Sequence, residues 1–224
     1  MIRLSEISHE EAARYMGVQG EPDEKIARLL DKYEPIVREN LRPAYVYRQG
    51  KIERTENELK ICGVSLLGND IRKHLKGCEM AIIFGATVSS EADKLIRQAS
   101  VTDMAAALAV DALCSAAIEQ VCNAAEEEIF ADVNAPYRTW RFSPGYGDLP
   151  ISHQKELLLA LNAQRRIGLT VTDSFLLIPS KSVTAVIGIR DSAPLHSPQG
   201  CKTCRMRENC AFRKNEGRIC ISMV

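Results

Sequence analysis

One long stretch without helix breakers limits what this chain can fold into more than any other feature. Residues 102–129 contain no glycine and no proline and consist largely of alanine, leucine and valine. Opened by Thr102-Asp103, the stretch predicts a helix about 40 Å long at roughly 1.5 Å per residue. Because its first half is apolar on almost every side, we expect this helix to lie in the core of the domain.

A short apolar run predicts the strand at the centre of the domain. Residues 80–84 read Met-Ala-Ile-Ile-Phe and end at Gly85, which is typical of a strand covered on both faces. Other periodic segments predict strands at 44–48, 51–53, 58–64, 174–178 and 183–189, and helices at 8–17, after Pro22, from Ser89 or Ser90, and at 152–167. Since strands and helices do not alternate regularly, we expect an α+β domain.

Length and composition favour one sizeable core. The chain has 224 residues, of which 46% are hydrophobic, so we expect one domain over 1–199 and a cysteine-rich appendage over 200–224. Its 29 basic and 29 acidic residues give no sign of a nucleic-acid or membrane partner. Glu6, Glu10 and Glu11 interrupt the first stretch, so no signal peptide is predicted, and we expect a cytoplasmic protein.

The loop from Arg141 to Pro150 is the segment best suited to hold a small ligand. It reads Arg-Phe-Ser-Pro-Gly-Tyr-Gly-Asp-Leu-Pro, in which glycines permit close backbone approach and prolines stiffen the chain. The guanidinium of Arg141 suits a carboxylate, and Tyr146 offers a flat face with a polar tip. The alternative is an ordered turn with Arg141 in a surface ion pair. Gly145-x-Gly147 lacks the third glycine of a dinucleotide fingerprint.

Polar residues recur along the long helix before this loop. Asp111, Ser115 and Glu119 stand four residues apart and therefore form one stripe on a nearly apolar helix. A buried carboxylate in this stripe needs a cationic partner, and the ammonium or sulfonium group of a ligand could be that partner. The alternative is that the stripe is the solvent face of the helix.

Three blocks of sequence resemble one known family. Arg141 to Tyr146 is similar to the Arg-x-x-x-Gly-Tyr motif of the activation domain of cobalamin-dependent methionine synthase, and residues 166–175 and 179–183 continue the similarity in the same order and spacing. The resemblance covers roughly residues 103–189. It implies an α+β fold with a twisted antiparallel sheet and flanking helices. It also implies a domain that binds S-adenosylmethionine and docks on a cobalamin module, whose oxidised cofactor then recovers a methyl group.

The resemblance also implies roles for single residues. Arg141 would grip the methionine carboxylate of S-adenosylmethionine, and backbone groups at Ser143 and Gly145 would meet polar edges of the ligand. Tyr146 would lie where the corrinoid approaches, and Glu119 is the counterpart of a glutamate that the family uses on its long helix. The implied partners are a corrinoid-binding methionine synthase, or a related corrinoid protein, and an electron donor such as a flavodoxin or ferredoxin. The chain would be a methyltransferase component without activity alone.

Half of the eight cysteines lie close together in the tail. They form the pattern C-x2-C-x5-C-x9-C, in which the thiolates are close enough to converge on one zinc ion or iron–sulfur cluster: Cys201, Cys204, Cys210 and Cys220. Reduced thiols without a metal are the alternative. A tail with an iron–sulfur cluster would favour a second function, that of a redox or scaffold protein serving a corrinoid protein. The other cysteines, Cys62, Cys78, Cys114 and Cys122, lie in apolar or helical contexts and are expected in the core.

The cysteine pattern predicts one bound metal per chain. Elemental analysis of anaerobically purified protein should find zinc or iron, and a brown colour would identify the cluster. Removing residues 200–224 should abolish metal binding and leave the main domain folded. Less than about a tenth of an equivalent of either metal, with the tail thiols freely titratable, would contradict the prediction.

Overall fold

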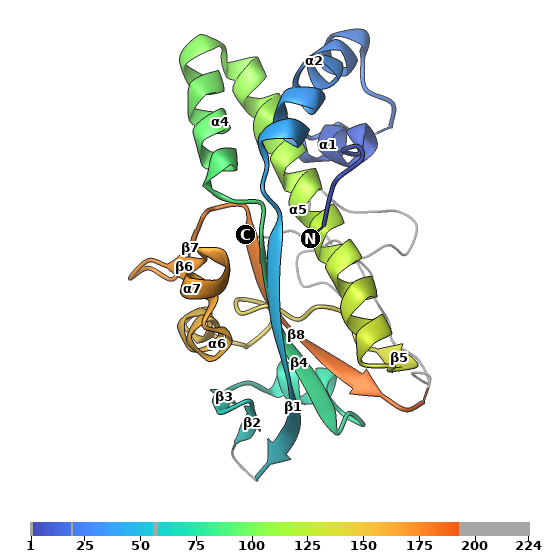
Figure 1. Cartoon of the computed structure of the whole chain (residues 1–224), viewed down its shortest axis with the longest axis vertical. Coiled ribbons are helices and arrows are strands. Elements are labelled where there is room, and N and C mark those ends of the chain that lie inside the picture. The colour runs from blue at the N-terminus through green and yellow to red at the C-terminus, as the bar shows by residue number, and fades with distance from the viewer. Residues whose placement is uncertain (1, 19, 56–57, 193–224) are drawn as a thin grey trace.

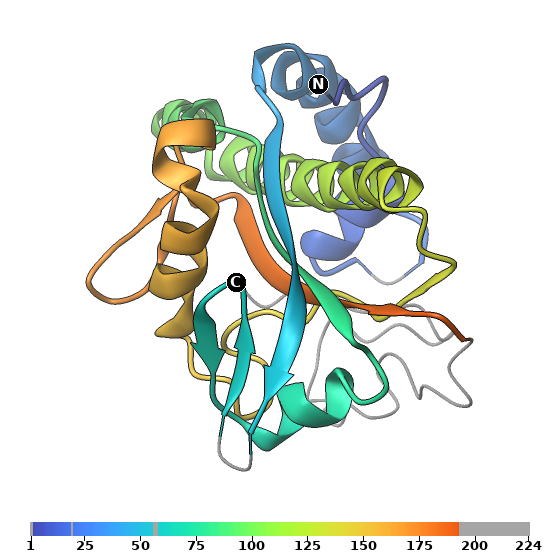
Figure 2. The same cartoon turned by 60° about the horizontal axis from the view of Figure 1, so that its bottom comes forward.

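A computed structural model describes residues 2–18, 20–55 and 58–192. This part of the chain forms a six-stranded sheet, a separate two-stranded ribbon and helices on both faces of the larger sheet (Figures 1 and 2). The elements in chain order are α1 (His9–Tyr15), α2 (Glu24–Asn40), β1 (Ala44–Arg54), β2 (Leu59–Ile61), β3 (Val64–Leu66), α3 (Asn69–His74), β4 (Met80–Thr87), α4 (Ser90–Thr102), α5 (Met104–Asp132), β5 (Tyr137–Arg138), α6 (His153–Leu161), α7 (Ala163–Ile167), β6 (Thr170–Val171), β7 (Leu177–Ile178) and β8 (Ser182–Arg190).

The large sheet is antiparallel throughout, with the strand order β3-β2-β1-β4-β8-β5. Strand β4 lies inside it, where Phe84 is opposite Tyr47 of β1 on one side and Ala185 of β8 on the other. Alternate residues of β4 enter two different cores: Ile82 and Phe84 lie with α5, whereas Ala81 and Ile83 lie with α6. The apolar run 80–84 is therefore a buried central strand, as predicted, and the α+β class is confirmed.

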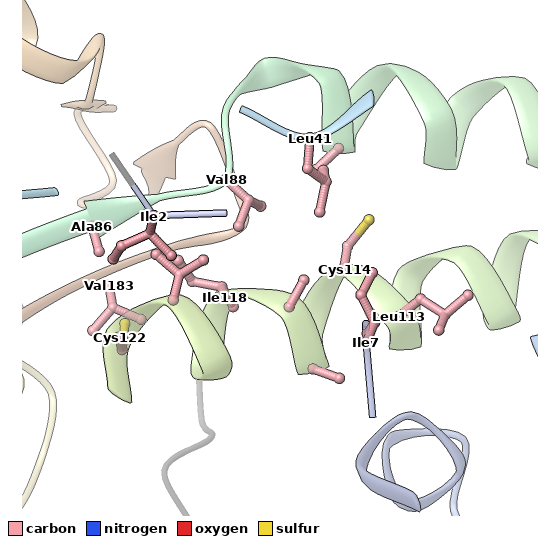
Figure 3. Packing of buried hydrophobic residues seen from close by; sticks show 14 of the residues in the cluster. Ile2, Ile7, Leu41, Ala86, Val88, Leu113, Cys114, Ile118, Cys122 and Val183 are labelled. Carbon is pink, nitrogen blue, oxygen red and sulfur yellow. The ribbon is translucent and has the colours of Figure 1, made fainter. Parts of the chain in front are cut away.

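Helix α5 is the central element of the first core, which is the core that contains Ile82 and Phe84. Asp103 caps it by accepting a hydrogen bond from the Ala105 amide at 3.1 Å, and α1, α2 and α4 lie along it on one side of the sheet (Figure 1). Figure 3 shows side chains of α5, among them Ile118 and Cys122, beside Val183 of β8 in this core. The long core helix expected from residues 102–129 is confirmed.

By length and composition, α5 could also cross a membrane. The mean hydropathy of an 18-residue window of this helix is 1.5. However, 67% of that window is buried inside the domain. The hydrophobicity of α5 is therefore explained by the core that it fills.

The strands differ from those predicted at two glycine positions, Gly50 and Gly63. The strands predicted at 44–48 and 51–53 are one strand, β1, because Gly50 is not a turn: a Cβ there would lie 2.6 Å from Cys62 Sγ, so glycine permits close approach. The strand predicted at 58–64 is instead a hairpin of β2 and β3. Cys62 and Gly63 turn between them with φ of 53° and 86°, which are the positive angles that two-residue hairpins favour.

The helix expected over 152–167 is divided at Asn162, whose left-handed conformation (φ 51°) separates α6 from α7. Pro35 lies inside α2, and that helix continues to Asn40. The two-residue strands β5 and β6 were not predicted because each is too short to show a period.

The burial of α5 predicts how its leucines contribute to stability. Leu113 is fully buried, and Leu113→Ala should lower the free energy of unfolding by about 2–5 kcal/mol, because it removes apolar contacts and leaves a cavity. Leu108, on the same helix, is 49% exposed, so Leu108→Ala should cost less than about 1 kcal/mol. Urea unfolding of both variants is the measurement. Equal losses would contradict the placement of the core.

Candidate functional site

The first residues of the predicted ligand loop lie along β8, which sets the direction of Arg141. The Phe142 amide donates to the Val186 carbonyl at 3.0 Å, and the Val186 amide donates back at 2.9 Å. Phe142 belongs to the second core, with α6. Since neighbouring side chains of an extended segment point to opposite faces, Arg141 points toward α5.

Arg141 is buried in a polar network with one face of α5. Its guanidinium donates through Nη2 to Glu119 Oε2 at 3.1 Å, through Nη1 to Glu126, and through both nitrogens to Asn123 Oδ1 at 3.1 Å. Residues 119, 123 and 126 stand at helical spacing and therefore share that face. The side chain of Arg141 is only 2% exposed, so this is a buried ion pair and not the surface pair considered as an alternative.

Burial sets the electrostatics of this network. It raises the pKa of Glu119 to about 7, although Arg141 acts in the opposite direction. Burial also lowers the pKa of Arg141, but the neighbouring Cys122, Glu126 and Glu119 outweigh it and the net direction is upward, so the guanidinium stays charged. One nitrogen of this charged group, Nε, is buried and has no hydrogen-bond partner within the described ranges. Arg141 therefore has a donor that its protein neighbours leave unused.

The acidic residues of the polar stripe on α5 pair with cationic side chains of the same chain. Lys181, just before β8, donates from Nζ to Ser115 Oγ at 2.9 Å and pairs with Asp111 Oδ1 at the same distance. Glu119 pairs with Arg141. The stripe is therefore not simply the solvent face of the helix, because Asp111 and Glu119 pair with cationic side chains of the same chain. A ligand contact of Glu119 stays a prediction.

The rest of the loop forms a tight turn against an aromatic cluster. Ser143 is buried, and Gly145 has a φ of 94°, a conformation that favours glycine. The Tyr146 ring lies 6.1 Å from that of Phe142 and 6.2 Å from that of Trp140. The structure thus brings Glu119 and Arg141 into direct contact and packs Tyr146 with the aromatic side chains that adjoin the second core.

His74 belongs to the same aromatic cluster, although the sequence assigned it no chemistry. Its ring lies 4.6 Å from that of Trp140, and Nε2 is 2.8 Å from Thr139 Oγ1. Burial lowers the pKa of His74 to about 4, so its ring is neutral at physiological pH. His74 therefore contributes ring packing and a hydrogen bond with Thr139.

Sequence reasoning also missed Asn123 and Glu126, which bond Arg141, and Lys181, which pairs with Asp111 of the polar stripe. The helical spacing of 119, 123 and 126 could have indicated the first two. The pairing of Lys181 depends on how β8 lies beside α5, which is a tertiary contact without a local pattern.

The predicted metal ligands Cys201, Cys204, Cys210 and Cys220 lie outside the described residues. Within the ranges that the structure describes, no group of three or more His, Cys, Asp or Glu side chains is arranged to hold a metal ion. Of the other cysteines, Cys78, Cys114 and Cys122 are buried free thiols, as expected, and Cys62 is partly exposed.

Comparison with known families adds to this geometry. Residues 90–197 match the sequence profile of the family described as vitamin B12 dependent methionine synthase, activation domain. The chain is therefore similar to this family over residues 90–197. The matched region contains Glu119, the whole ligand loop and β8, and it begins at the first residue of α4.

Solved structures extend the likeness beyond the matched region. The crystal structure of the MetH reactivation domain bound to AdoHcy has a TM-score of 0.59 and 17% sequence identity to this chain, and the match covers 88% of this chain and 82% of that one. At this identity the likeness concerns the fold. A search of curated protein sequences found no match. The activation-domain fold thus includes N-terminal elements that the sequence profile does not reach.

The raised pKa of Glu119 predicts a pH dependence of stability. The folded chain binds this proton more tightly than the unfolded chain, because burial raises the pKa from 4.5 to about 7. The stability that Glu119 contributes is therefore fully present below about pH 4.5 and is lost as pH rises toward 7, with a slope of at most about 1.4 kcal/mol per pH unit. Glu119→Gln should remove that slope in urea unfolding measured from about pH 4.5 to 8.

Glu127→Gln is the matched control, since Glu127 lies on the same helix with 73% of its side chain exposed. Its unfolding free energy should follow the wild-type pH dependence. If Glu119→Gln followed it as well, the carboxyl of Glu119 would not be the titrating group.

Proposed function

We propose that this activation domain binds S-adenosylmethionine at Arg141 and presents its methyl group to a corrinoid held by a partner methionine synthase. The observation that supports this most is a charged guanidinium, buried beside the family's motif loop, with its Nε donor unused. A planar guanidinium suits a carboxylate, and the methionine part of the ligand carries one.

Binding requires a rearrangement of the existing ion pairs. A ligand carboxylate that bonds two guanidinium nitrogens takes the place of an α5 side chain, because Nη1 and Nη2 already donate to Glu119, Asn123 and Glu126. Glu119 is the residue to be displaced, since burial raises its pKa to about 7 and its charged form is the less favoured. Once released from Arg141, its carboxyl group is available to the ammonium group of the ligand.

The rest of the loop surrounds the ligand. Backbone groups at Ser143 and Gly145 meet its polar edges, and the left-handed conformation of Gly145 opens the backbone there. Tyr146 lies on the side from which the corrinoid approaches. The domain holds and orients the methyl donor, and the corrinoid supplies the nucleophile: cob(II)alamin and one electron take the methyl group, yielding methylcobalamin and S-adenosylhomocysteine.

The proposed activity needs partners. No nucleophile for a methyl group accompanies the loop, so turnover requires a corrinoid protein and an electron donor such as a flavodoxin or ferredoxin, in the cytoplasm. The alternative, an iron–sulfur redox or scaffold protein, depends on cysteines beyond the described residues. No feature of the described part favours it over the ligand site at Arg141.

Arg141 is the residue whose substitution tests the proposal. Arg141→Ala should raise the dissociation constant for S-adenosylmethionine about 10- to 150-fold, because a hydrogen bond to a charged group contributes roughly 1.5–3 kcal/mol. Arg141→Lys should recover only part of this loss, since an ammonium group cannot make two parallel bonds. Calorimetric titration of each variant is the measurement.

Two controls separate binding from folding. Arg141→Ala leaves the carboxylates of Glu119 and Glu126 without their buried cation. The unfolding free energy is therefore recorded for each variant. If the Ala variant does not fold, the Lys variant alone tests the proposal. Methylthioadenosine lacks the carboxylate and should bind wild type and variants about equally. If the Lys variant weakens both ligands alike, or neither, Arg141 is structural and the proposal fails.

A further inference from the structure

The end of the ligand loop is fastened to a helix far away in the sequence. The amide of Asn69 donates to Asp148 Oδ2 at 2.7 Å, and the amide of Asp70 donates to Asp148 Oδ1 at 2.9 Å. These amides open α3, whose N-cap position is Gly68 and has no side chain to cap them. Asp148 therefore supplies, from the loop, the cap that α3 lacks.

Asp148 remains charged in this role. Hydrogen bonds from the amides of Asp70 and Asn69 lower the pKa of its exposed carboxyl group. A charged acceptor strengthens both hydrogen bonds.

Glycines on both segments allow this contact. At Gly68, where φ is 131°, a Cβ would lie 2.6 Å from Asp148 Oδ1. At Gly147, where φ is 55°, a Cβ would collide with the carboxylate of Asp70. Each segment thus presents a glycine to the aspartate of the other, and a side chain at 68 or 147 would collide with the facing aspartate.

Leu149, the residue after Asp148, closes the turn that contains the proposed ligand groups. The Gly145 amide donates to the Leu149 carbonyl at 2.9 Å, and the Leu149 amide donates to the Tyr146 carbonyl at 3.0 Å. The partner helix is itself fixed, because Ile71 of α3 and the following Leu75 are fully buried in the second core. The loop is consequently held at both ends, at Phe142 by β8 and at Asp148 by α3.

We propose that Asp148 is a positioning residue for the S-adenosylmethionine site, which by capping α3 holds Gly145 and Tyr146 in the conformation that receives the ligand. This inference rests on the proposed function and deepens it. Asp148 acts through the loop backbone and does not contact the ligand itself.

The test compares three variants of the whole chain. Asp148→Ala removes both acceptors, and Asp148→Asn keeps one carbonyl oxygen. Asp23→Ala is the matched control, because Asp23 is also an exposed capping aspartate, accepting from the Ile26 amide at 2.9 Å at the start of α2. Asp148→Ala should raise the dissociation constant for S-adenosylmethionine about tenfold, Asp148→Asn should raise it less, and Asp23→Ala should leave it unchanged.

A second readout needs no ligand. Trp140 is the single tryptophan of the chain, and its ring contacts that of Tyr146. If Asp148 positions the loop, Asp148→Ala should shift the emission of Trp140 in the folded, ligand-free protein, and Asp23→Ala should not.

The outcomes are distinct. Unchanged affinity and unchanged emission in Asp148→Ala would overturn the inference, as would an equal loss of affinity in Asp148→Ala and Asp23→Ala, which indicates a general loss of stability. If the wild type itself does not bind S-adenosylmethionine, the result counts against the proposed function instead. In that case the emission of Trp140 alone tests whether Asp148 holds the loop.

Discussion

The burial of one guanidinium group is the constraint on which the arrangement of the domain depends. A charged Arg141 away from water is costly unless it is paired and hydrogen-bonded, and its partners Glu119, Asn123 and Glu126 all come from one face of α5. Because Phe142, the next residue, is held by β8, this pairing fixes where α5 lies along the sheet. The same interaction therefore builds the candidate ligand site and sets the position of α5 in the core.

The elements that the sequence predicted well are those whose burial is uniform along their length. Each of the two long apolar runs, residues 80–84 and the run in α5, is apolar because it fills a core. An uninterrupted run of this kind can be recognised from the sequence alone. Predictions failed where one residue had two possible uses. The break predicted between the strands at 44–48 and 51–53 is absent, because Gly50 allows Cys62 to approach. The turn at Cys62-Gly63 was not predicted because it lies inside a run that alternates like a strand.

The residues of the candidate site also divide into those that the sequence could indicate and those that it could not. Arg141 and Glu119 could be named from the motif and the helix, and their direct contact agrees with that selection. Glu126, which also pairs with Arg141, could have been indicated by its helical spacing from Glu119. What the sequence could not show is that Lys181 pairs with Asp111, because this pairing depends on how the start of β8 lies beside α5. A local pattern identifies residues suited to a ligand, but it does not show which of them already satisfy one another.

The paired glycines at 68 and 147 have a consequence for how the sequence can change. Gly68 tolerates no side chain while Asp148 stands opposite, and Gly147 tolerates none while Asp70 does. A side chain at either position is disfavoured for two reasons, the positive φ of the backbone and the aspartate that faces it. Related chains that keep this loop conformation are thus expected to keep glycine at 68 and 147 even where the facing aspartate has changed, so the aspartates are free to vary before the glycines are.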